Sequence, residues 1–367
     1  MTSRTPRPVA RPFPTGSDEL TGSWLATTLG SSGARTPEVE VSRIGEGRGH
    51  MGSAFRIRVV GDEPADLPRS VVVKLPATQE EARQTADRGG LYEREVLFFQ
   101  EIAPRIPMRV PGCHAAGYAA GEGFVLVLED LGGATEIDQL DGLEPALAVG
   151  ILEQLADFHA MWWESDELAS MTWATRHTDA HRVANLTRIL REGWPRLTAS
   201  LADVLPNGCH EAGADMADLL PDAFAALANA PQTLLHGDVR LDNVLFVDPE
   251  SPAVILDWQS VSRGAAVIDV AYFLAQNISA TELEVRGGEL LTAYRNRLAC
   301  HGVEMDTTAL RDQIALAMPL TFAVASSLFV LADTSDERTR ELARVMATRA
   351  AAAVDHFGHP RDVLQSV

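Results

Sequence analysis

The sequence predicts an α+β fold of two lobes, a small antiparallel β-rich lobe followed by a larger, mainly helical lobe. Alternation of apolar and polar residues, typical of half-buried strands, fills the first third of the chain. Helical periodicity governs most of the remainder, and the change of pattern falls at the adjacent glycines Gly132 and Gly133. We therefore expect lobes over residues 19–131 and 132–367, which a chain of 367 residues accommodates.

The tail at residues 1–18 is rich in proline and arginine. It lacks the apolar core of a signal peptide, and we expect it to be disordered. The elements expected in the first lobe are strands at 39–44, 54–60 and 70–74, one key helix at 91–102, and strands at 113–119 and 124–128.

The second lobe is expected to be helical, with short apolar strands inserted in its middle. The expected helices lie at 144–163, 181–201 and 212–228, and further helices follow up to residue 357. The short strands are expected at 233–235, 244–246 and 253–256.

The charge and cysteine content restrict the class of partner. A net charge of −20 argues against a nucleic-acid partner or an anionic membrane, since both recruit lysine and arginine. The same charge is compatible with a cationic small substrate. The 3 cysteines lie far apart in the sequence, so they indicate neither a disulfide framework nor a zinc site, and they fit a reducing cytoplasm.

Residues 314–332 form an uncharged segment of near-spanning length. Pro319 and several hydroxyl residues interrupt it, and acidic residues flank it without a positively charged cluster. We therefore expect a buried helix at the centre of the helical lobe and no membrane partner.

The segment LLHGDVRLDNVLFVDPESPAVILD, residues 234–257, carries the densest chemistry. A short apolar strand ends at His236-Gly237-Asp238, Asn243 follows, and Asp257 ends a second apolar strand. An amide oxygen from Asn243 and a carboxylate from Asp257 suit Mg²⁺, which is commonly held by few side chains plus substrate phosphates. Asp238 is then free to orient a hydroxyl group and take its proton. The alternative is an ordinary polar turn, which fits poorly with apolar strands on both sides.

The pattern H-G-D-x-x-x-x-N followed by a strand-ending aspartate resembles the aminoglycoside phosphotransferase and choline-kinase superfamily, which shares its fold with protein kinases. The stretches ILDWQSVSRGAAVIDVAYFLAQ and FHAMWW are similar to its ecdysteroid-kinase-like, or CHK-kinase-like, branch. The resemblance covers about residues 39–335. It implies a protein-kinase-like two-lobe fold and a small-molecule kinase. Such an enzyme transfers the γ-phosphoryl group of ATP, or alternatively GTP, to a hydroxyl of a small metabolite or drug-like alcohol.

Lys74, the last residue of the expected third strand before Leu75, is the only lysine in the chain. Kinase-fold enzymes place a lysine of the third strand against the α- and β-phosphates and pair it with a glutamate of the next helix. On the helix from residue 91, Glu95 shares a face with apolar residues whereas Glu93 points away. Because a carboxylate on an apolar face is costly to bury unless it is paired, we expect Glu95 to be the partner of Lys74.

The segment with Gly47, Gly49 and Gly52 reads G-x-G-x-x-G. A strand pattern follows it instead of the helix that a dinucleotide-binding fold requires, so we expect a strand–loop–strand lid over phosphates. A P-loop is excluded because the sole lysine lies elsewhere. The resemblance further implies that the backbone from Glu129 to Leu131 contacts the adenine.

Three further residues have two interpretations each. Arg240 takes the place of a lysine found in many protein kinases and would steady the transferring phosphoryl group; a structural salt bridge is the alternative. Trp162 and Trp163 would contact a cationic substrate through their ring faces, or pack in the helical core, which we favour.

Three more residues are expected to be structural. His159 is expected to be a hydrogen-bonded core residue, Asp269 a helix cap and His236 a residue that shapes its loop.

Two rival functions remain. A nucleotide-binding pseudokinase without turnover would be expected to lack Asp238, Asn243 or Asp257, and all three are present. A metal-dependent phosphohydrolase using His236 would need more histidine and carboxylate ligands nearby. No A-P-E-like segment follows the DWQ loop, so a protein substrate is not expected, and few features point to aminoglycosides.

Overall fold

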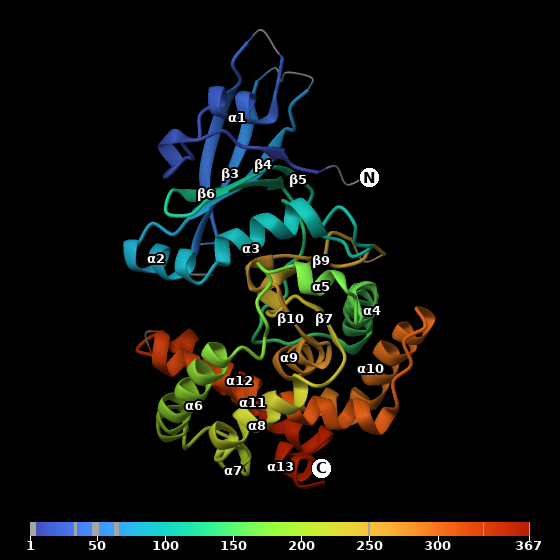
Figure 1. The fold of residues 1–367 in the computed structure, drawn as a ribbon. Helices are drawn as coiled ribbons and strands as arrows, with labels where there is room; N and C mark the ends of the chain where they lie inside the picture. The colour runs from blue at the N-terminus through green and yellow to red at the C-terminus, as the bar shows by residue number, and fades with distance from the viewer. Residues whose placement is uncertain are drawn as a thin grey trace. The chain divides into compact units, whose positions relative to one another are not determined.

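The computed structural model describes residues 5–32, 35–45, 51–61, 66–248, 250–332 and 334–366. The chain divides into two compact units (Figure 1). The first unit comprises Met1–Ala134 together with Val254–Val261, and the second comprises Thr135–Ala253 together with Ser262–Val367. The expected boundary after residue 131 lies close to this division. The segment 254–261, however, joins the first unit although it follows most of the second in sequence.

The first unit contains a six-stranded sheet with the order β1-β5-β6-β4-β3-β2. All neighbouring strands are antiparallel except β1, which runs parallel to β5. Alternate side chains of the central strands, such as Phe55, Ile57, Val71 and Val73, are buried, as the alternation predicts. The strands are β1 (Arg7–Pro8), β2 (Glu38–Ile44), β3 (Gly52–Val60), β4 (Ser70–Pro76), β5 (Cys113–Ala119) and β6 (Gly123–Glu129).

Residues 5–18 pack against this sheet, which differs from the expected disordered tail. Arg7 pairs with Ala115 in the β1–β5 ladder. The ring of Phe13 is buried and lies over Gly117, where an added Cβ would come within 2.8 Å of it. Composition suggested disorder because proline and arginine dominate the segment, but one buried aromatic ring above a glycine and a short ladder are sufficient to hold it.

Helical segments accompany the sheet: the 3₁₀ turn η1 (Ser17–Glu19), α1 (Gly22–Leu29), α2 (Glu80–Arg88), α3 (Leu91–Leu97) and the π-helical turn η2 (Phe98–Ile102). The expected helix at 91–102 is therefore present, but its last turn is π-helical. The helix α3 lies against β5 and β6 (Figure 1). Phe98 stacks on Trp258 at a centroid distance of 3.9 Å, and this contact ties the segment 254–261 to the first unit. That segment contains β9 (Val254–Ile255) and the 3₁₀ turn η4 (Trp258–Ser260).

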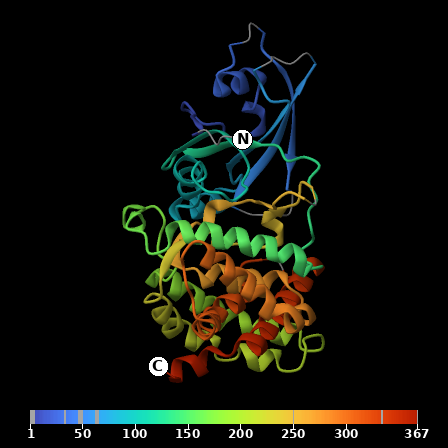
Figure 2. The ribbon, with the colours of Figure 1, turned by 90° about the vertical axis from the view of Figure 1, so that its right-hand side faces the viewer.

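The second unit is mainly helical. Its helices are α4 (Pro145–Trp162), α5 (Glu167–Ser170), α6 (Ala180–Ser200), α7 (Cys209–Gly213), α8 (Met216–Leu227), α9 (Val267–Asn277), α10 (Ala280–Cys300), α11 (Thr307–Leu331), α12 (Glu337–Phe357) and α13 (Pro360–Ser366). The helix expected at 212–228 is divided into α7 and α8. Helix α4 packs along α10 (Figure 2), and α11 contacts α6, α8, α9 and α12.

Short strands flank the loop with the H-G-D motif, residues 236–238, in this unit. The strands β7 (Gln232–Leu235) and β10 (Ser262–Ala265) are antiparallel, with Leu235 opposite Ser262. The 3₁₀ turn η3 (Leu241–Asn243) and β8 (Val244–Leu245) follow the H-G-D motif. The loop therefore leaves a buried strand and returns to one.

Among the described residues, α11 is the one helix long and apolar enough to cross a membrane by length and composition. Most of its apolar stretch is buried inside the second unit; Ile314, Ala317, Met318 and Phe322 are each 0% exposed. A helix in the core of a helical domain can be as long and as apolar as a membrane-spanning helix. The burial of α11 therefore matches the buried central helix that the sequence predicts.

Candidate active site

The lysine of β4 is held between two carboxylates of the first unit. Lys74 Nζ donates hydrogen bonds to Glu95 Oε1 at 2.5 Å and to Asp257 Oδ1 at 2.8 Å. In the ladders, Lys74 lies opposite Ala54 of β3 and Leu126 of β6, so its backbone is fixed on both sides. The pairing of Lys74 with Glu95 is confirmed. The contact with Asp257 was not predicted.

The charges of these three groups compensate one another. Burial alone would lower the pKa of Lys74, but Asp257 and Glu95 outweigh it and raise the pKa. Burial raises the pKa of Glu95, which the charge of Lys74 partly offsets. Lys74 and Asp257 are each 25% exposed, and charged groups with perturbed pKa values that a ligand can reach are typical of functional sites.

Asp257 has a strained backbone. Its φ of 60° and ψ of 67° lie in the left-handed region, which costs a non-glycine residue on the order of 1 kcal/mol. Its carboxylate also accepts a hydrogen bond from Gln259 Nε2 at 3.0 Å. The adjacent Trp258 is fully buried, and its Nε1 donates to the carbonyl of Ile255 at 3.1 Å, which anchors the turn. Asp257 therefore has a strained backbone, and the buried ring of Trp258 anchors the turn in which it lies.

The carboxylate of Asp238, in the second unit, is fixed at both oxygens. Its Oδ1 accepts a hydrogen bond from the hydroxyl of Tyr272 at 2.5 Å. Its Oδ2 accepts one from Asn243 Nδ2 at 3.1 Å, and the same amide nitrogen donates to the backbone carbonyl of Asp238 at 2.9 Å. The structure thus brings Asp238 and Asn243 together, and it adds Tyr272, which sequence reasoning did not single out.

Helix α9 anchors the rest of this loop. Asp269, expected to be a helix cap, is a fully buried residue of the first turn whose carboxylate accepts hydrogen bonds from the backbone N–H groups of His236 at 2.7 Å and Gly237 at 2.8 Å. The cap prediction is wrong because Ala266 precedes the helix, and Asp269 instead binds a neighbouring loop. Asn277, at the far end of α9, donates to the carbonyl of Val239 at 3.0 Å. One helix therefore positions the loop along its length.

The two histidines have the structural roles expected of them. His159 is fully buried, with Nδ1 bonded to the hydroxyl of Tyr294 at 2.9 Å and Nε2 at 3.3 Å from Asp269. His236 Nδ1 accepts a hydrogen bond from the N–H of Asp238 at 3.1 Å, which shapes the loop. Burial would raise the pKa of Asp269, but its hydrogen bond with His159 and the neighbouring charges lower it, so Asp269 stays ionised.

Arg240 lies close to two carboxylates. Its Nε is 3.6 Å from Asp238 Oδ1, and its Nη1 is 3.4 Å from Asp242 Oδ2. These ion pairs fit the structural interpretation, and they also keep the guanidinium beside Asp238, as the phosphoryl-binding interpretation requires. Trp162 is buried in the core, as favoured from the sequence.

The predicted nucleotide-contacting backbone is partly described. Gly47 and Gly49 lie outside the described residues, whereas Gly52 begins β3, so a strand follows the glycines as expected. Glu129 ends β6, and its N–H donates to the carbonyl of Gly112 at 2.7 Å. The carbonyl of Leu131 accepts a hydrogen bond from the N–H of Ala134 at 3.0 Å. The contact with adenine stays a prediction.

The two predicted magnesium ligands belong to different units, Asn243 to the second and Asp257 to the first. Within the described part of the chain, Asn243 Oδ1 accepts no hydrogen bond, because only its Nδ2 is engaged. An available amide oxygen and an aspartate carboxylate are a donor set that suits Mg²⁺ with phosphate oxygens. The described residues contain no group of three or more histidine, cysteine, aspartate or glutamate side chains that could hold a metal ion.

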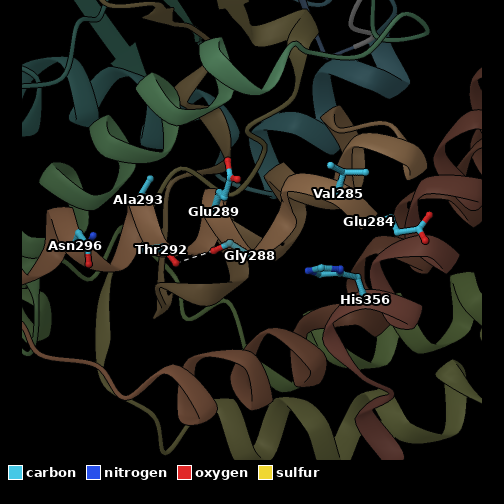
Figure 3. Close-up of a pocket in the computed structure, with 8 residues that line it drawn as sticks. All are labelled: Glu284, Val285, Gly288, Glu289, Thr292, Ala293, Asn296 and His356. Carbon is cyan, nitrogen blue, oxygen red and sulfur yellow. Dashed lines mark hydrogen bonds between the residues drawn. The ribbon is translucent and has the colours of Figure 1, made fainter.

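A cavity of about 660 Å³ lies elsewhere in the second unit (Figure 3). His356 of α12 lines it together with residues from successive turns of α10, namely Glu284, Val285, Gly288, Glu289, Thr292, Ala293 and Asn296. None of these is a predicted site residue, so this cavity is not the expected active site.

The β-rich unit with its lysine–glutamate pair and the helical unit with its H-G-D loop define a protein-kinase-like two-lobe fold. The chain belongs to the ecdysteroid kinase-like family, whose model matches residues 46–305. Comparison with curated protein sequences gives no significant match.

Solved structures share this fold at low sequence identity. A choline kinase from Cryptosporidium parvum Iowa II has a TM-score of 0.54 and 11% identity, covering 86% of this chain and 89% of its own. A choline/ethanolamine kinase family protein from Mesorhizobium loti has a TM-score of 0.51 and 17% identity, covering 94% and 98%. A mutant aminoglycoside 2'-phosphotransferase-IIIa in complex with GDP has a TM-score of 0.51 and 13% identity, covering 90% and 96%.

Proposed function

We propose that the protein is a small-molecule kinase that transfers the γ-phosphoryl group of ATP to a hydroxyl group of a small metabolite or drug-like alcohol. Membership of the ecdysteroid kinase-like family and the fold shared with kinases of small alcohols support this proposal. GTP is the alternative donor, since one structure of the same fold was solved with GDP. The observation that carries the proposal is the sole lysine, Lys74, held between Glu95 and Asp257.

The first unit supplies the proposed nucleotide contacts. Lys74 donates hydrogen bonds to oxygens of the α- and β-phosphates, and Glu95 keeps its ammonium group in place. Backbone N–H groups of the segment from Gly47 to Gly52 cover the phosphates, and the backbone from Glu129 to Leu131 contacts the adenine.

The second unit supplies the proposed acceptor chemistry. The carboxylate of Asp238 accepts a hydrogen bond from the acceptor hydroxyl, aligns its oxygen with the γ-phosphorus and takes its proton. Tyr272 and Asn243 hold that carboxylate still, so the rate gain is mostly a matter of position. Arg240 neutralises charge on the transferring group.

Asn243 and Asp257 are the proposed ligands of magnesium, through an amide oxygen and a carboxylate oxygen. Magnesium, when bound, supplies charge neutralisation at the β- and γ-phosphates. The carboxylate of Asp257 also accepts a hydrogen bond from Lys74. The cysteines are free, which supports the proposal of a cytoplasmic location.

An ATP-consumption screen over chemically diverse hydroxyl compounds tests the function, with Asp238→Ala as the blank. We expect acceptor-dependent formation of ADP by the unaltered protein and a loss of about 10³-fold or more in kcat for the variant, with Mg·ATP affinity changed by no more than about threefold. Binding of Mg·ATP by calorimetry, with no consumption across the whole panel, would favour the pseudokinase alternative. Equal turnover by the variant would remove Asp238 from the mechanism.

A further inference from the structure

A segment of the second unit that no predicted role explains runs beside the H-G-D loop. His177 N–H donates to the carbonyl of Arg263 at 2.7 Å, and Arg263 N–H donates to the carbonyl of Thr175 at 2.9 Å, so residues 175–177 follow the edge of β10. The strand β10 pairs with β7, and β7 leads directly to Asp238. The segment then enters the first turn of α6, which contains Arg182.

Arg182 is a partly buried cation with no hydrogen bond or ion pair to the described residues. Its Nε is buried and makes no hydrogen bond, and no carboxylate lies within ion-pair distance of its guanidinium, as far as the chain is described. Its side chain is nonetheless close enough to interact electrostatically with Asp238, Tyr272 and Asp269. Burial lowers the pKa of Arg182, and these acidic groups offset only part of that effect. A positive charge thus lies within electrostatic range of the proposed catalytic carboxylate, beyond ion-pair distance.

A second buried nitrogen near Arg182 also lacks a partner. His177 is fully buried, and its Nδ1 is bonded to the hydroxyl of Ser262 at 3.0 Å. Its Nε2 makes no hydrogen bond within the described ranges. Burial and the neighbouring charge of Arg182 hold the pKa of His177 well below its ordinary value, so the ring is neutral. When the Nδ1 accepts from the serine, the Nε2 carries a proton that it can donate.

Unpaired buried donors are costly, and natural proteins retain few of them. Each costs about 1–3 kcal/mol, and more when the group is charged. Arg263, in the adjacent strand β10, shows what a structural arginine does here, because it donates to the carbonyls of Ala174 at 2.6 Å and Leu168 at 2.5 Å. Arg182 has no such acceptors. Two unpaired buried nitrogens, Arg182 Nε and His177 Nε2, therefore indicate a position for a group that hydrogen-bonds with them.

We propose that Arg182, assisted by His177, binds an anionic group of the acceptor alcohol, so that the acceptor is a hydroxy compound bearing a carboxylate, sulfate or phosphate. A guanidinium group matches the paired oxygens of such anions and stays charged when buried. This inference rests on the proposed kinase function. An anionic acceptor differs from the cationic substrate with which the net charge is compatible. The local charge near the reacting hydroxyl decides recognition more than the net charge of the whole chain, because charges interact most strongly at short range.

Inorganic sulfate is the first probe, titrated by calorimetry into the protein with its nucleotide site saturated with Mg·ADP. We expect measurable binding that Arg182→Gln weakens at least tenfold and that Arg188→Gln does not change. Arg188 is the matched control because it lies on the same helix, is exposed and pairs with Glu192. Absence of sulfate binding, or equal binding by Arg182→Gln, would overturn the proposal. Arg182→Lys keeps the charge and provides a second variant if the glutamine variant does not fold.

A second experiment with matched acceptors then shows whether Arg182 binds the anionic group of the acceptor or the transferring phosphoryl group. Hydroxy acids and their methyl esters are compared as substrates, and we expect the acid to be preferred in kcat/KM. Arg182→Gln should lower the acid-to-ester ratio about 10- to 100-fold, the loss typical of a charge-assisted hydrogen bond. An equal loss for acid and ester would mean that Arg182 acts on the phosphoryl group or on the fold, and the inference would be wrong. If no acceptor turns over, the kinase function fails, and the sulfate titration still decides whether the anion site exists.

Discussion

The hydroxyl group of Tyr272 offers the sharpest test of how Asp238 is held. It donates a hydrogen bond of 2.5 Å to Asp238 Oδ1, and the ring is buried in α9. Burial and the charge of Asp238 raise the pKa of Tyr272 well above its ordinary value, so the hydroxyl remains a donor at any assay pH. Tyr272→Phe removes this donor and keeps the ring.

A hydrogen bond to a charged group contributes about 1.5–3 kcal/mol, so the variant should lower kcat about 10- to 150-fold if the bond positions Asp238 for catalysis. Losing the donor also disfavours the ionised carboxylate, and the acidic limb of the kcat/KM profile should move to higher pH. Affinity for Mg·ATP should stay unchanged. The assay is steady-state phosphoryl transfer with an acceptor from the hydroxyl screen, measured from about pH 5 to about pH 9.

Tyr118→Phe is the matched control, because the hydroxyl of Tyr118 donates to Asp87 Oδ1 at 3.0 Å in the first unit, a bond in which no predicted site residue takes part. It removes the same tyrosine–aspartate bond and should leave kcat unchanged. If Tyr272→Phe also keeps kcat within about twofold of the unaltered protein and an unshifted profile, then the bond does not position the base.

Three other substitutions test different parts of the molecule. Lys74→Met should lower kcat/KM for ATP about 100-fold or more at a similar melting temperature, measured by initial rates and thermal unfolding; a normal rate would exclude the phosphate contact. Burial opposes a low pKa for Asp130, but its bonds to Ser70 and to Arg56 prevail and lower it, so its stabilisation is present above the unfolded pKa and is lost as the pH falls through the folded pKa. Asp130→Asn should therefore lower the melting temperature by about 2–4 °C at pH 7, and by progressively less as the pH falls through the folded pKa. Gly117→Val should push the ring of Phe13 away and cost about 1–3 kcal/mol, and it should make residues 5–18 sensitive to protease; unchanged proteolysis would contradict the packing described.

Features set by one buried face could be predicted from the sequence. Alternation located the strands of the first unit, and the period of α3 distinguished Glu95 from Glu93 as the inward carboxylate. In both cases the burial of one face imposes a local pattern on the residues, and a local pattern is what a single sequence displays.

The residues that were missed depend on contacts between distant segments. Asp269 has the appearance of a helix cap and Tyr272 of a core aromatic, and their contacts with the H-G-D loop arise only when α9 packs beneath it. One signal was present, because Asp269 and Tyr272 are polar groups one turn apart in the otherwise apolar run VIDVAYFLA. Residues 254–261 belong to the first unit because Phe98 stacks against Trp258. This contact joins distant segments, so no local sequence pattern indicates it.

A crystal structure with Mg²⁺ and a non-hydrolysable ATP analogue tests the central claim most directly, namely that residues of both units bind one nucleotide triphosphate. We expect Lys74 Nζ within hydrogen-bond distance of an α- or β-phosphate oxygen, and oxygens of Asn243 and Asp257 at about 2.0–2.1 Å from the same magnesium ion. A bound nucleotide whose phosphates contact neither Lys74 nor a magnesium ion held by Asn243 and Asp257 would contradict the proposed function.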